Sequence, residues 1–125
     1  MKGELDFFKV IEGIIEKDPR YKSEAYLFVM AALNYTVSKL EKPRHITGQE
    51  LSEGIRFYTI EQFGPMARTV LEHWGVYTTE DFGNIVFNMT DAKLLSKTET
   101  DSIGDFKDVY DFKSVFDKAV EYKLE

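Results

Sequence analysis

Cysteine is absent from the 125 residues of this chain. Its absence excludes disulfide bonds, thiolate nucleophiles and every zinc site that uses Cys ligands, and it fits a reducing compartment. The start of the chain, Met1 to Phe8, carries Glu4 and Asp6 where a signal peptide needs a basic start and an apolar core. We therefore expect a cytoplasmic protein.

Long apolar runs and excess positive charge are also missing. The longest apolar run, Ala25 to Leu33, is far shorter than the roughly 20 residues of a membrane span, so we expect no membrane association. Sixteen Lys and Arg stand against 22 Asp and Glu, a net charge of −6. Phosphate backbones attract basic surfaces, so this balance argues against nucleic-acid binding. The locally basic stretch from Lys42 to His45 is interpreted as a solvated loop, with a basic patch as the alternative.

Apolar residues are plentiful, and their spacing predicts a mainly α fold in a single domain, residues 1–125. We expect five or six helices, at about 6–17, 23–40, 48–63, 66–74, 79–93 and 114–122. The clearest local signal is Thr47 to Glu50, which matches a capping box. Glycine is expected to end two of the helices, at Gly64 and Gly75.

The C-terminal part predicts one small β hairpin or strand pair. Val109 to Phe112 reads as a short strand, which would pair with residues near Leu95. Two helices that meet at the tight turn from Gly75 to Thr78, followed by a β hairpin, have the order of a winged helix. The second of these helices carries three acidic residues against one Lys, so its charge favours protein over nucleic acid as the partner.

Six segments spread over nearly the whole chain carry a family resemblance: Asp18–Tyr21, Glu24–Phe28, Arg44–Leu51, Gln62–Leu71, Thr79–Asn88 and Leu95–Ser102. Together they resemble an uncharacterised bacterial family labelled as a hypothetical protein restricted to the Verrucomicrobia and Planctomycetes. The resemblance implies no activity, cofactor or catalytic residue.

Candidate site residues are few. Arg44 and His45 precede the free amides at the start of the helix at 48–63, a place where an anion could bind, although Glu50 brings negative charge there. With Arg68 and Glu72, they are the best candidates for a polar cleft of an enzyme or ligand-binding protein. His73 lies next to Glu72 in sequence and so points away from it on a helix. The chain contains no P-loop, dinucleotide fingerprint or metal-binding motif, so we expect no cofactor and no metal.

The favoured function is therefore a non-enzymatic protein-interaction module, with self-association as one form of it. The alternatives are a winged-helix nucleic-acid-binding regulator and a small enzyme or anion-binding protein that uses the Arg44–His45 region. Phe57, Tyr77 and Tyr110 fit the core pattern least well and are the aromatic candidates for an interface, although core positions remain their default.

We expect no appreciable binding to duplex DNA at physiological salt. Non-specific binding by DNA-binding proteins, at about 10⁻⁴ to 10⁻⁶ M, comes almost wholly from Lys and Arg contacts to phosphates, and such contacts are scarce here. A mobility-shift assay over a salt series checks this. Micromolar binding that weakens steeply with salt and is lost in Arg44→Ala would contradict it.

Overall fold

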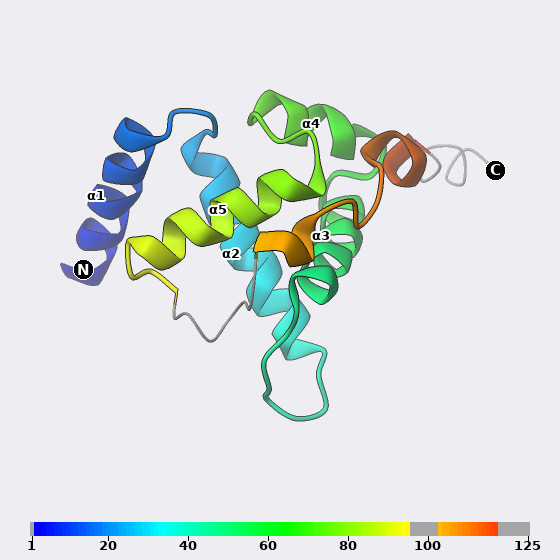
Figure 1. The fold of residues 1–125 in the computed structure, drawn as a ribbon, viewed down its shortest axis with the longest axis horizontal. Helices are drawn as coiled ribbons and strands as arrows, with labels where there is room; N and C mark the ends of the chain where they lie inside the picture. Colours follow the sequence, from blue (N-terminus) through cyan, green and yellow to red (C-terminus); the bar gives the residue numbers. More distant parts are fainter. Residues whose placement is uncertain (1, 96–102, 118–125) are drawn as a thin grey trace.

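The structure is a computed structural model that describes residues 2–95 and 103–117. Within them the chain forms five α-helices and two short 3-10 helices: α1 (Lys2–Lys17), α2 (Ser23–Ser38), α3 (Gly48–Phe63), η1 (Gly64–Met66), α4 (Ala67–His73), α5 (Thr79–Asp91) and η3 (Ile103–Phe106). Residues 112–117 are also helical. In Figure 1, α5 crosses over α2, with α1 on one side and α3 and α4 on the other. No described helix is both long enough and apolar enough to cross a membrane.

The predicted β hairpin is wrong, since the described residues contain no strand. Residues 109–111 are irregular, and the segment that follows them is helical rather than extended. Asp111 begins this helix, because its carboxylate accepts hydrogen bonds from the Ser114 backbone N–H (3.0 Å) and hydroxyl (3.1 Å). Phe112 and Phe116, four residues apart, are both buried and pack edge to face with their ring centroids 5.2 Å apart. The described residues therefore form an all-α fold without a β wing; the expected helix end near residue 122 lies outside them.

Two helix starts follow the local sequence closely. At α3, the Thr47 hydroxyl accepts from the Glu50 N–H (3.0 Å) and the Glu50 carboxylate accepts from the Thr47 N–H (2.9 Å), which confirms the predicted capping box. At α5, the Asp81 carboxylate accepts from the Thr78 N–H (3.1 Å) in the same way. The helix bounds differ from the expected ones by a few residues, most at α1, which begins at Lys2 rather than near Asp6.

Helix α2 is the centre of the domain, as its apolar character on nearly all sides predicts. It contacts α1, α3 and α5. Its fully buried side chains include Tyr26 and Ala32, which share one core cluster with Leu51 and Ile55 of α3 and Phe82 and Ile85 of α5.

Phe106, in η3, packs between α3 and α5, two helices that are far apart in the sequence. Its ring is fully buried, and a methyl group placed on Gly48 of α3 or on Gly83 of α5 would come within 2.9 Å of it. The Phe106 carbonyl also accepts a hydrogen bond from the Thr79 hydroxyl at 2.6 Å. Two glycines therefore make the space for one aromatic ring between α3 and α5.

Three polar side chains of α5, those of Asp81, Asn84 and Asn88, form hydrogen bonds with the turn between α1 and α2 and with the start of α2. Asp81 accepts a hydrogen bond from the Tyr21 hydroxyl at 2.5 Å, and Asn84 donates to the same hydroxyl at 3.0 Å. Asn88 donates to the Asp18 carboxylate (2.9 Å) and to the Tyr26 hydroxyl (3.1 Å). Burial, followed by the hydrogen bond to Asp81, raises the pKa of Tyr21. The side-chain amides of Asn84 and Asn88 are therefore engaged in hydrogen bonds within the fold.

Gly75 offers the sharpest test of the packing between the α1–α2 turn and the end of α4. Its φ is +91°, and a Cβ there would lie 2.2 Å from the Arg20 carbonyl oxygen. We expect Gly75→Ala to lower the free energy of unfolding by at least about 2 kcal/mol, because the left-handed backbone and the contact both oppose a side chain.

Gly13→Ala is the matched control, since a Cβ at Gly13 meets nothing within 4 Å. In the interior of α1 this change should raise stability by about 0.5–1 kcal/mol. Urea unfolding measures both variants. Equal stabilities for the two would show that the turn adapts to a side chain.

Candidate functional site

Arg44 lies in the loop just before α3, as the sequence predicts, and it is bound to a carboxylate of its own chain. Its guanidinium donates to both carboxylate oxygens of Glu50, at 2.8 and 3.1 Å, and to the His45 carbonyl at 2.7 Å. The same carboxylate caps α3 through Thr47. The charge and the amide that an anion would need are therefore already engaged by Glu50.

The electrostatics of this corner follow from that pairing. The Arg44 guanidinium, and then the Thr47 backbone N–H, lower the pKa of Glu50 to about 2. Glu50 raises the pKa of Arg44 in turn. Both groups are thus charged at any physiological pH, and neither is poised to transfer a proton.

Arg68 and Glu72 come together, on one face of α4. Arg68 donates to Glu72 at 3.0 Å and to Asp117, in the helical stretch at 112–117, at 2.9 Å. This ion-pair set ties α4 to the end of the described chain. His73, next along α4, is exposed.

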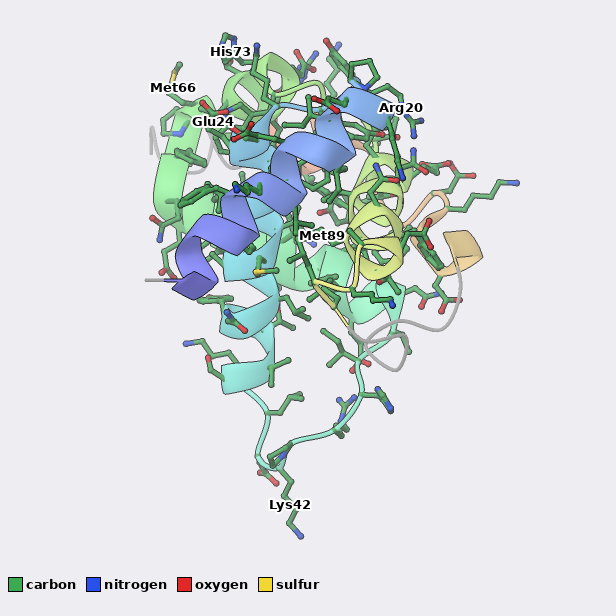
Figure 2. The ribbon with its side chains drawn as sticks, turned by 90° about the vertical axis from the view of Figure 1, so that its left-hand side faces the viewer. Arg20, Glu24, Lys42, Met66, His73 and Met89 are labelled. Atoms are coloured by element: carbon green, nitrogen blue, oxygen red, sulfur yellow. The ribbon has the colours of Figure 1, made fainter. Side chains whose placement is uncertain are left out.

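The two groups of predicted site residues do not meet. Figure 2 shows Lys42, in the loop that carries Arg44 and His45, at the opposite end of the molecule from His73 at the end of α4. Among the described residues, no group of three or more His, Asp or Glu side chains could hold a metal ion. In the described part of the chain, Arg44 and Arg68 thus belong to two separate sets of ion pairs and share no polar cleft.

A groove runs along α2 and α3, and we call it the α2–α3 groove. It has a volume of about 470 Å³. Its lining is Tyr35, Thr36, Lys39 and Leu40 from α2 and the loop after it, and Gln49, Glu50, Glu53, Gly54 and Phe57 from α3. Phe57 is 55% exposed, so a large aromatic surface faces solvent there.

The floor of the groove is a close contact between the two helices. A Cβ on Gly54 would lie 1.9 Å from the Thr36 hydroxyl oxygen, which donates to the Ala32 carbonyl at 2.7 Å. No residue larger than glycine fits at position 54 unless Thr36 moves. A glycine inside a helix commonly has such a packing reason, and this was the sequence signal that could have located the groove.

Charged side chains stand on both walls of the groove. On α2, the Lys39 ammonium lies 5.0 Å from the centre of the Tyr35 ring. On α3, Glu53 is paired with Arg56 at 3.0 Å, and the Arg56 guanidinium lies 5.3 Å from the centre of the Phe57 ring. In the described part of the chain no carboxylate forms an ion pair with Lys39.

Two smaller hollows are less suited to binding. One of about 280 Å³ lies between α1 and α5 near Asp18 and Asn88, whose polar groups already bond to each other. The other, of about 250 Å³, lies beside Tyr77, Glu80 and Asp111, and the Asp111 carboxylate is engaged as a helix cap. Of the three aromatic candidates, Phe57 and Tyr77 are exposed, whereas Tyr110 is partly buried and donates to the Ser52 carbonyl at 2.6 Å.

Comparison with protein-family models, curated proteins and solved structures gave no match to this chain. The resemblance to an uncharacterised bacterial family therefore stays a prediction. The function has to be argued from the geometry of the chain.

The Arg44–Glu50 pair gives a pH-dependent prediction. The pKa of Glu50 in the folded chain, about 2, lies below its ordinary value of 4.5, so the stability that its charge adds is complete above about pH 4.5 and lost as the pH falls toward 2. We expect Glu50→Gln to lower the free energy of unfolding by about 1 kcal/mol at pH 7, because both partners are partly exposed and screened by solvent.

The difference between the wild type and Glu50→Gln should shrink between pH 4.5 and 2 in urea unfolding. Glu12→Gln, on the exposed side of α1, removes one negative charge without touching this pair and serves as the control. A difference that stays constant down to pH 2 would contradict the assignment.

Proposed function

We propose that this protein is a non-enzymatic protein-interaction module, which acts in the cytoplasm and binds its partner through the α2–α3 groove. The observation that carries the proposal is the groove itself, with the exposed Phe57 ring above a floor of closely packed helices. Grooves between helices commonly accept the apolar face of another helix, and exposed aromatic rings are frequent anchors of protein interfaces.

The state of the polar side chains favours binding over catalysis. An enzyme needs convergent groups with free protons, lone pairs or charges. Here Arg44 is bound to Glu50, and Arg68 to Glu72 and Asp117, in two separate sets of ion pairs. The lack of cysteine supports the cytoplasm as the compartment.

A photo-crosslinking side chain at position 57 tests the groove as a docking surface. We expect p-benzoylphenylalanine in place of Phe57 to give a discrete adduct upon irradiation of cells that express the protein. The adduct should map by mass spectrometry to one peptide of one partner, because a specific interface fixes the neighbours of the ring.

The same replacement at Phe8 is the matched control, since Phe8 lies on α1 and is 51% exposed. We expect no discrete adduct there. No adduct at position 57, or the same diffuse products at both positions, would rule out the groove as the docking surface.

A further inference from the structure

We infer that the partner in the α2–α3 groove is an amphipathic helix with an acidic residue that pairs with Lys39. This inference rests on the proposed function and adds the chemistry of the partner to it. The apolar face of such a helix covers Phe57, Tyr35 and Leu40, which line the groove. Its carboxylate lies at the end of the groove near the loop after α2.

The walls of the groove favour a helix over an extended segment. Both walls are helices, and the backbone N–H and C=O groups of a helix bond to each other along most of its length. An extended segment finds no sheet edge there, so its own backbone groups would stay unpaired where the groove excludes water. A partner helix satisfies its backbone internally, and only its side chains have to fit the groove.

The charges that line the groove are balanced except for one. Glu50 is paired with Arg44, and Glu53 with Arg56. Lys39 forms no ion pair with a carboxylate in the described part of the chain. Counted together with the two arginines, the lining therefore keeps one positive charge, that of Lys39, on a chain whose net charge is −6.

A partner that covers the groove has to satisfy this charge. The Lys39 ammonium lies 5.0 Å from the centre of the Tyr35 ring. The ring attracts the ammonium through one face, but an ammonium has three N–H donors, and water serves the others as long as the groove is open. A helix that covers Tyr35 removes that water, and an ammonium buried without an acceptor is costly. A carboxylate on the partner replaces the lost water, whereas a basic residue there is repelled.

The separation of Phe57 from Lys39 fixes the place of the carboxylate on the partner. Thr36 and Gly54 are in contact and mark one level along the groove. At a rise of about 1.5 Å per residue, Phe57 lies about 4.5 Å from this level on one side and Lys39 about 4.5 Å on the other. The carboxylate should therefore follow or precede the residue that packs on Phe57 by about two helical turns, on the same face of the partner.

Charge reversal at Lys39 tests the carboxylate. The probe is a labelled synthetic peptide of the segment that mass spectrometry maps at position 57, and fluorescence anisotropy gives its dissociation constant. We expect Lys39→Glu to raise this constant about tenfold or more, because two carboxylates then meet in a covered site. Lys39→Arg should keep the constant within about threefold of the wild type, since a guanidinium also donates to a carboxylate.

A charge exchange locates the acidic residue on the partner. In the peptide, the Asp or Glu about two turns from the photo-reacted residue is replaced by Lys. This peptide should bind the wild type about tenfold or more weakly than the native peptide does, and Lys39→Glu should restore the binding. Lys42→Glu changes an exposed loop residue that does not line the groove. It is the matched control and should leave the dissociation constant of the native peptide within about threefold of the wild type. Circular dichroism checks that every variant is folded and that the bound peptide is helical.

The two proposals fail in different ways. The lack of a discrete adduct at position 57 would overturn the docking surface and the acidic helix with it. A discrete adduct whose peptide binds Lys39→Glu as tightly as the wild type would overturn the acidic helix alone. A bound peptide that is extended or has no carboxylate at that spacing would do the same, and so would an adduct that maps to a second copy of this chain.

Discussion

The contact between Gly54 and Thr36 sets the distance between α2 and α3, and the rest of the domain depends on that distance. The Thr36 hydroxyl is held by the Ala32 carbonyl, and position 54 has no room for a Cβ beside it. Because the helices meet so closely, Leu51 and Ile55 on the inner side of α3 are completely buried. On the outer side the same approach leaves an open groove between the side chains that diverge above the contact. The core and the proposed docking surface are therefore two faces of one helix pair.

The C-terminal part of the described chain packs against α3 in a similar way. Phe106 occupies the space that Gly48 and Gly83 leave open, and Thr79 fixes its backbone. In both places, at Gly54 and around Phe106, glycine leaves the space into which a neighbouring side chain packs. Close packing on two sides therefore holds α3 in place. A rigid, preformed groove loses little conformational entropy when a partner binds.

Much of this fold could be predicted from the sequence, because several signals act over a few residues. The capping box at Thr47 and Glu50, the central position of α2 and the helix end at Gly75 depend on local chemistry and are observed. The prediction of a strand at Val109 to Phe112 was wrong because a short aromatic run fits the periodicity of a helix as well as that of a strand. A helix forms there because Asp111 caps its start and because Phe112 and Phe116 lie on one buried face of it.

The candidate site was harder to predict because it depends on tertiary partners. Arg44 and Glu50 are visible as neighbours of a helix start, but the bidentate pair between them requires a particular path of the loop. The groove requires Gly54 to meet Thr36, 18 positions earlier in the chain, and no local pattern encodes that pairing. Sequence reasoning did single out Phe57 as a poor core residue, and it is exposed.

The distribution of charge around the groove bears on the kind of binding that the proposal describes. The net charge of −6 repels other acidic chains at long range, so an acidic partner has to be held by short-range contacts at the groove. Glu53 is paired with Arg56 and Glu50 with Arg44, so among the charged residues that line the groove Lys39 is the one without a carboxylate partner in the described part of the chain. Charges arranged in this way add little affinity, but they exclude partners of the wrong pattern. The apolar surface around Phe57 then supplies the attraction, and the charged walls supply the register.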